Sequence, residues 1–226
     1  MQDNVKVLYK DKNVIVIEKP VGMPSQADPT GDTDAMTATS AELRASGENH
    51  ALWLVHRLDR TVGGLLAFAR NKRSAAELSR IVRDGELGKR YFAVCHGIAE
   101  DGEYRDLLFK DNATSKAYVV KTARSGAKLA ILHARSLGVT DGMSLMAVEL
   151  ETGRFHQIRA QFASRGHSLV GDKKYGSRDT ARRTPCLFSS SLSFELFGKR
   201  ITVFAAPACD EYPWNLFDTE LYGQLS

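Results

Sequence analysis

The sequence predicts an α+β protein with a mixed, largely antiparallel sheet. Many short β-rich runs alternate with turns that contain Gly, Asp or Asn, whereas few segments have the character of helices. Short strands joined by turns, with few helices between them, are typical of this class. The expected strands are 5–9, 14–18, 52–55, 65–69, 89–96, 116–122, 129–136, 144–150, 192–197 and 200–204. The first two and the last two of these strands are expected to form hairpins.

Three helices are expected, and one of them has clear start and stop signals. Between residues 72 and 84, apolar residues recur at helical spacing. Asn71 is a suitable N-cap for this helix, and Gly85 is a suitable end. The other two helices are expected at 37–45 and at 154–165, the second of them stopped by the glycine that follows.

Length and composition indicate an ordinary soluble globular protein. The chain has 226 residues, of which 43% are hydrophobic and 26% are charged. Such a chain can bury a substantial core as one domain or two small ones. The net charge of +4 and the pI of about 8.9 permit nucleic-acid binding without demonstrating it, because function depends on where the charges cluster.

The cysteines and the hydropathy pattern indicate the compartment. Cys95, Cys186 and Cys209 lie far apart and form no C-x-x-C pair, so the sequence indicates neither a disulfide framework nor a zinc site. Reduced thiols are typical of cytoplasmic proteins. The first residues lack the apolar core of a signal peptide, and no apolar run approaches the roughly 18 residues that span a membrane. We therefore expect a cytoplasmic protein with no membrane partner and no metal.

The segment 56–70, HRLDRTVGGLLAFAR, places an acidic residue among basic ones. Arg57 and Arg60 flank Asp59, and a carboxylate beside fixed cations stays ionised at neutral pH. An ionised carboxylate can act as a nucleophile or a base, and the same arginines can hold a phosphate. The alternative is a surface ion-pair cluster at a turn, which is a common structural arrangement.

A second segment, 150–176 (LETGRFHQIRAQFASRGHSLVGDKKYG), also gathers Arg, His and Gln around apolar residues. In this order, the two segments resemble the RNA pseudouridine synthases of the RluA/RsuA type, and the RluA branch in particular. Three shorter motifs agree with the resemblance, namely EKPVG at 18–22, KRYFAV at 89–94 and GDKKYG at 171–176. The resemblance covers about residues 5–205.

The resemblance implies a curved central sheet with flanking helices and loops, as one catalytic domain over residues 1–226. A separate N-terminal RNA-binding module of the S4 type is expected to be absent, because the first strand begins near residue 5. The implied activity is the isomerisation of specific uridines in rRNA or tRNA to pseudouridine, without a cofactor or metal. RNA is the expected partner, no obligatory protein partner is expected, and a monomer is the simpler state.

The resemblance also implies roles for individual residues. Asp59 matches the catalytic Asp, Tyr91 matches the Tyr that stacks on the target base, and Arg159 matches the Arg that pairs with the catalytic Asp. The residues expected to bind substrate are Arg57, Arg60 and Leu187, the last by its position only. Turns and local structure, rather than chemistry, are the expected roles of Lys19, Asp172 and His156.

Helix periodicity supports a directed role for Arg159. In the expected helix 154–165, apolar residues at i, i+3 and i+7 form one buried face, and Arg159 borders it. A buried guanidinium needs an acceptor, for which Asp59 is the candidate. The alternatives are that Arg159 snorkels from a half-buried helix and that Tyr91 is a core residue with its hydroxyl at the surface.

The sequence departs from the family pattern at two places. The family's T-S-G after the HRLD motif is Thr61-Val62-Gly63-Gly64 here, which keeps a small, flexible turn. The family's L-H-A near the end is Leu187-Phe188-Ser189 here, and the lost His puts local contacts and substrate choice in doubt.

Basic residues along the chain are expected to contact the phosphate backbone, so that RNA binding weakens with salt. These residues are Arg57, Arg60, Lys89, Arg90, Lys173, Lys174, Arg178, Arg182 and Arg183. One alternative function is a non-catalytic RNA-binding protein with the same fold. A glycosidase is the other alternative, but that class usually needs two carboxylates, and only Asp59 is prominent in the motifs.

Overall fold

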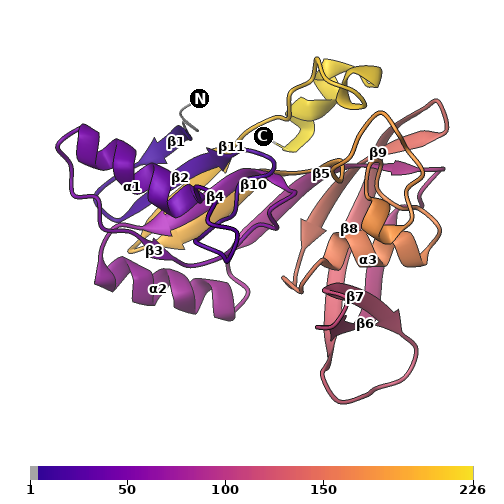
Figure 1. Cartoon of the computed structure of the whole chain (residues 1–226), viewed down its shortest axis with the longest axis horizontal. Coiled ribbons are helices and arrows are strands. Elements are labelled where there is room, and N and C mark those ends of the chain that lie inside the picture. The colour runs from indigo at the N-terminus through magenta and orange to yellow at the C-terminus, as the bar shows by residue number, and fades with distance from the viewer. Residues whose placement is uncertain (1–4, 226) are drawn as a thin grey trace. The chain divides into compact units, whose positions relative to one another are not determined.

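The computed structural model describes residues 5–225 and divides them into two compact units (Figure 1). The first unit comprises residues 5–88 and 189–205, and the second comprises residues 89–188 and 206–225. The α+β class with a mixed, largely antiparallel sheet is confirmed. The assignment of the whole chain to one catalytic domain stays a prediction.

The first unit is built on a sheet whose strands follow the order β1-β2-β4-β10-β11, with β3 paired to β4. These strands are β1 (Lys6–Lys10), β2 (Val14–Lys19), β3 (Trp53–Leu54), β4 (Gly63–Ala69), β10 (Leu187–Leu196) and β11 (Lys199–Phe204). The β1–β2 and β10–β11 hairpins, both expected from the sequence, are antiparallel. All residues of β4 are buried, which explains why its sequence is a continuous apolar run.

Two helices belong to the first unit, α1 (Ala35–Ala45) and α2 (Lys72–Arg83). The Asn71 side chain accepts a hydrogen bond from the Ser74 N–H and caps α2, as predicted. Gly85 follows the helix with φ +79°, a left-handed conformation that glycine adopts without strain. Helix α2 packs against β3 and β4.

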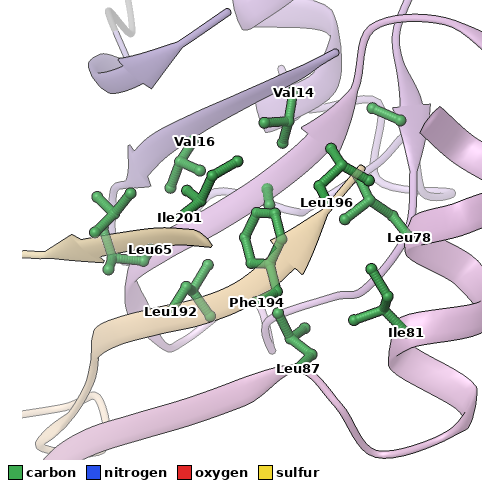
Figure 2. Close-up of a cluster of buried hydrophobic side chains, with 13 residues drawn as sticks. Val14, Val16, Leu65, Leu78, Ile81, Leu87, Leu192, Phe194, Leu196 and Ile201 are labelled. Carbon is green, nitrogen blue, oxygen red and sulfur yellow. The ribbon is translucent and has the colours of Figure 1, made fainter. Parts of the chain in front are cut away.

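The core of the first unit lies between α2 and the sheet (Figure 2). Phe194 of β10 is 1% exposed and lies among aliphatic side chains from the neighbouring strands and from the helix. The buried members of this core are Val14, Val16, Leu65, Ala67, Ala69, Leu78, Ile81, Leu87, Leu192, Phe194, Leu196, Ile201 and Val203.

The second unit carries a sheet of order β5-β9-β8-β6-β7, in which all neighbours are antiparallel. Its strands are β5 (Gly88–His96), β6 (Gly102–Asp111), β7 (Lys116–Val120), β8 (Ala127–Thr140) and β9 (Met143–Leu150). Helix α3 (Gln157–Ser164) packs against β6 and β7. The short 3₁₀ helices are η1 (Lys173–Tyr175), η2 (Trp214–Leu216) and η3 (Thr219–Leu225).

Two elements of the second unit differ from expectation. Strand β6 was not predicted, because charged and apolar residues are mixed along it without a clear alternation. Helix α3 begins at Gln157 rather than at residue 154, because His156 has the left-handed backbone conformation, with φ +52°. The Gln157 side chain then caps the preceding turn by accepting from the Arg154 N–H at 2.9 Å.

Among residues 5–225, no helix is long and apolar enough to cross a membrane.

Two aromatic residues of the β10–β11 hairpin should differ sharply in their effect on stability. Phe194→Ala should lower the free energy of unfolding by about 3–5 kcal/mol, because it leaves a cavity in the core. Phe197→Asn should leave stability within about 0.5 kcal/mol, because Phe197 is 43% exposed and its φ of +53° is one that Asn tolerates better. Urea unfolding followed by circular dichroism measures both, and equal losses would contradict this account of the core.

Candidate active site

Asp59 lies in the loop between β3 and β4, and a buried lysine holds this loop. Lys19 at the end of β2 is 1% exposed. Its ammonium donates to the carbonyl oxygens of Pro20 at 2.9 Å, Met23 at 2.7 Å and Arg60 at 3.3 Å. Lys19 therefore joins the turn that follows β2 to the residue next to Asp59, which agrees with its expected structural role.

Further bonds tie the same two loops together. The Gly22 N–H donates to the Arg60 carbonyl at 2.8 Å. The Ser25 hydroxyl donates to the Leu58 carbonyl at 2.8 Å and accepts from the Leu58 N–H at 3.1 Å. The backbone on both sides of Asp59 is thus fixed by hydrogen bonds, so the carboxylate is carried by a preorganised loop.

The electrostatics of this loop favour an ionised carboxylate. Asp59 is half-buried, and its charge acts on Lys19. Burial lowers the pKa of Lys19 to about 8, while Asp59 opposes this shift and Arg60 adds to it. At neutral pH the lysine is therefore still protonated and supplies a positive charge close to Asp59.

The two arginines beside Asp59 have different surroundings. Arg57 is exposed. Arg60 forms ion pairs with Asp28 at 3.7 Å and with Asp32, and it donates to Thr30 Oγ1 at 2.9 Å. Arg60 therefore secures the loop 28–32 in this structure, and its predicted contact with RNA stays a prediction.

The close packing of strands β4 and β10 explains why position 64, which follows the HRLD motif, is a glycine. Its φ is +108°, and a Cβ at this position would overlap the backbone of Ser189 in β10. Only glycine allows the two strands to approach so closely directly after the Asp59 loop.

Tyr91 and Leu187 both lie in the second unit. Tyr91 belongs to β5, is 7% exposed and stands opposite Val148 of β9. Leu187 is 6% exposed and begins β10. The Val94 N–H donates to the Cys186 carbonyl at 3.0 Å, and this bond places Leu187 beside the strand that carries Tyr91.

Arg159 of α3 forms a buried ion pair that the sequence analysis missed. Its Nε donates to Asp172 Oδ2 at 2.7 Å and its Nη2 donates to Asp172 Oδ1 at 2.8 Å. Both side chains are nearly inaccessible to solvent, at 6% and 1% exposure. Asp172 therefore supplies a buried acceptor for this guanidinium, and the predicted pairing of Arg159 with Asp59, in the other unit, stays a prediction.

Tyr175 supports Arg159 from one side. The Arg159 guanidinium lies 5.0 Å from the centre of the Tyr175 ring. The Tyr175 hydroxyl oxygen accepts from the Ala117 N–H of β7 at 2.8 Å and lies 3.0 Å from His156 Nδ1. Burial and the charge of Arg159 lower the pKa of His156 to about 3, so this imidazole is neutral and can accept the Tyr175 proton. His156 has the structural role that was expected.

The structure divides the basic residues into those with protein acceptors and those without. Arg90 pairs with Glu149 at 2.9 Å, and Lys174 donates to the Ser115 carbonyl at 3.0 Å. Arg182 donates to the carbonyls of Thr184 at 3.2 Å and Tyr212 at 3.0 Å. These bonds of Arg182 anchor the segment 177–186. The exposed members of the set that have no such acceptor among the described residues are Arg57, Lys173, Arg178 and Arg183.

One group of side chains in residues 5–225 could hold a metal ion. Atoms of Glu103, His133 and Glu151 lie within 4.8 Å of one another on the exposed face of the second sheet. His133 Nε2 already lies 2.6 Å from Glu151 Oε1, and Arg105 donates to Glu103 at 2.6 Å. These protein contacts satisfy the group without an ion.

Comparisons with known proteins agree with this geometry. The sequence profile of a family described as RNA pseudouridylate synthase matches residues 13–164. The chain belongs to this family. It therefore belongs to the same family as its RluA-type relatives. The resemblance to the RNA pseudouridine synthases, noted in the sequence, is confirmed.

The relatives of this pseudouridine synthase family member differ in length. The chain is 32% identical over 207 residues to the ribosomal large subunit pseudouridine synthase C of Rickettsia felis, covering 88% of this chain and 66% of the relative. It is 32% identical over 208 residues to an uncharacterised RNA pseudouridine synthase of Zymomonas mobilis, covering 89% of this chain and 93% of that relative. Against another relative, from Bacillus subtilis, the chain spans only 57% of the length.

The fold matches a solved structure of the same family. The human RNA pseudouridylate synthase domain containing 4 superposes with a TM-score of 0.75 at 20% identity, covering 90% of this chain and 89% of that one. At this identity the comparison shows the pseudouridine synthase fold alone.

Sequence reasoning found the motifs of this site but not all of their contacts. Asp172 was expected only to fix a turn, although GDKKYG was recognised as a motif, and its pairing with Arg159 was missed. A buried Arg on a short helix, followed by an Asp in the next turn, was the available signal. Tyr175 belongs to the same motif, and its position beneath Arg159 could not be read from spacing.

Arg159→Ala should lower the free energy of unfolding by about 3–5 kcal/mol, because it leaves the buried Asp172 carboxylate without its partner. Arg105→Ala is the control, since the Arg105–Glu103 pair is exposed, at 52% and 39%, and such pairs contribute about 0.2–1 kcal/mol. Denaturant unfolding measures both variants. An Arg159→Ala loss no larger than that of the control would contradict the buried pair.

The buried Lys19 should give stability a distinct pH dependence. Its folded pKa of about 8 lies below its usual value of 10.5, so between these pH values the unfolded chain binds the extra proton. Stability relative to Lys19→Met should therefore rise as the pH rises through this window, by a total on the order of 3 kcal/mol. Urea unfolding of both proteins from pH 7 to pH 11 measures the difference, with the exposed Lys12→Met as the control. A difference that does not change with pH would contradict the perturbed lysine.

Proposed function

We propose that the chain isomerises specific uridines of structured RNA to pseudouridine, with Asp59, Tyr91 and Arg159 as catalytic residues. The single observation that carries the proposal is the preorganised Asp59 loop in a chain of the RNA pseudouridylate synthase family. A half-buried carboxylate, fixed by backbone bonds and facing the Lys19 ammonium, suits a reaction that needs an ionised acid at one position.

The reaction imposes definite requirements on these residues. The bond between C1′ of ribose and N1 of uracil breaks, the base turns, C5 bonds to C1′, the C5 proton leaves, and N1 takes up a proton. Asp59 serves this sequence as a nucleophile at the ribose or the base, or as a base for a ribose proton. We propose that Tyr91 holds the free uracil and takes the C5 proton, directly or through water.

The remaining assignments concern the substrate. The target base must leave its helical stack to reach Asp59, so Arg57 and Arg60 are proposed to contact the RNA around the extruded nucleotide. Leu187 is proposed to pack against uracil. The name of the Rickettsia felis relative points to large-subunit rRNA, and a cytoplasmic monomer acting on rRNA or tRNA is the form we propose.

A non-catalytic RNA-binding protein with the same fold is the second candidate. It would need the basic residues but not the Asp59 carboxylate. Substitution of Asp59 therefore separates the two functions.

Asp59→Asn should abolish turnover while leaving the fold intact, because the amide is isosteric but is neither a nucleophile nor a base. Tritium release from bulk cellular RNA that lacks the modification and is labelled at uridine C5 measures turnover. We expect release by the wild type and none above background by Asp59→Asn.

Asp210→Asn, at an exposed carboxylate outside all motifs, is the matched control and should keep wild-type turnover. Circular dichroism and RNA binding verify that each variant is folded. Turnover by a folded Asp59→Asn protein would exclude Asp59 as the catalytic group. RNA binding without turnover by the wild type would favour the non-catalytic candidate.

A further inference from the structure

Lys89 is a partly buried cation that differs from Lys19 and Arg159 in having no acceptor in the described part of the chain. It lies at the start of β5, two residues before Tyr91, with most of its side chain removed from solvent. Within residues 5–225, no carboxylate and no hydrogen-bond acceptor pairs with its ammonium, whereas Lys19 donates to three carbonyl oxygens and Arg159 is paired with Asp172. A half-buried ammonium without an acceptor is costly, so its presence calls for an explanation.

A second cation lies beside Lys89. The Arg154 charge acts on Lys89 and, together with burial, lowers its pKa. Arg154 is held in place because its Nε donates to the Leu129 carbonyl at 2.8 Å, and it likewise pairs with no carboxylate in the described chain. Two like charges are thus kept close together without an anion between them, which destabilises both.

The backbone between the two cations leaves room for the lysine. Gly153 precedes Arg154, and a Cβ at this glycine would lie 3.1 Å from Lys89 Nζ. A side chain at this position would crowd the ammonium, which would have to shift by a few tenths of an ångström. Glycine, the fixed guanidinium and the half-buried ammonium together form a small cationic recess, which we call the Lys89 recess.

We infer that the Lys89 recess binds a phosphate group of the RNA next to the target uridine. An oxyanion would supply a negative charge for both cations. The phosphodiester of RNA has two non-bridging oxygens that share one negative charge, one to accept from the ammonium and one from the guanidinium. The inference rests on the proposed function, because an RNA substrate supplies the phosphate.

The position of the recess identifies which phosphate is bound. Side chains alternate along a strand, so Lys89 and Tyr91 project from the same face of β5, with Cα atoms about 7 Å apart. A nucleotide whose base stacks on Tyr91 would place a phosphate of the same or the adjacent nucleotide near Lys89. Arg90, between them, points to the other face and is paired with Glu149.

The salt dependence of RNA binding tests this inference. Each phosphate neutralised by a protein cation contributes about 0.7–0.9 to the slope of log affinity against log salt concentration. Lys89→Met keeps the length of the side chain and removes the charge. Binding to an unmodified transcript of large-subunit rRNA, measured between about 50 and 200 mM KCl, should therefore have a slope less steep by about 0.7–0.9.

Two further variants make the comparison specific. Lys12→Met removes one exposed charge from the β1–β2 turn and should keep the wild-type slope. Lys89→Arg should restore most of the slope, since it restores the charge. If Lys89→Met proves unfolded by circular dichroism, Arg154→Met takes its place with the same expected change.

The outcomes separate this inference from the proposed function. A smaller slope for Lys89→Met alone supports the phosphate site, even if the wild type releases no tritium and the proposed function fails. Equal slopes for the wild type and Lys89→Met would overturn the inference. An equal decrease for Lys12→Met would also overturn it, because the effect would then be one of net charge.

Discussion

The ammonium of Lys19 is bonded to three backbone carbonyls, and the position of the Asp59 loop depends on those bonds. Neither strand β2 nor strand β4 could fix this loop alone, because Asp59 lies beyond the ladder that joins them. A lysine is suited to this task, since three N–H groups on one atom can bind carbonyls from different segments. Its charge also favours the ionised form of the nearby carboxylate, so one side chain determines both geometry and electrostatics.

In the second unit, the guanidinium of Arg159 joins helix α3 to the turn that contains Asp172. Asp172 binds the Nε and one Nη2 proton of Arg159, and Tyr175 covers the face of the group. The guanidinium carries five N–H donors, so the bonds to Asp172 use only part of its capacity. Because Asp172 offsets the charge, Arg159 can remain buried. A fixed planar donor of this kind is what the pairing proposed for Asp59 requires.

Secondary structure could be predicted from the sequence where the residues that specify an element lie next to one another in the chain. Helix α2 has its cap at Asn71 and its stop at Gly85 within the segment itself, and both were identified. The start of α3 was misplaced because a left-handed His156 leaves no mark in the hydropathy pattern. The Arg159–Asp172 pair was missed because it joins a helix to a separate turn, and tertiary contacts of this kind do not follow from spacing. Motif resemblance located the site, but only the structure supplied its contacts.

Net charge alone would have been a poor guide to where RNA binds. The chain carries 31 lysines and arginines against 27 acidic residues, and many of its arginines already pair with protein carboxylates or donate to carbonyls. Such arginines stabilise loops and helices, and an RNA phosphate would have to compete with their partners. A cation that the fold partly buries and leaves without an acceptor has no such competitor, and part of its desolvation has already occurred in the free protein. For this reason the local balance of charge at Lys89 and Arg154 carries more information about phosphate binding than the overall excess of basic residues does.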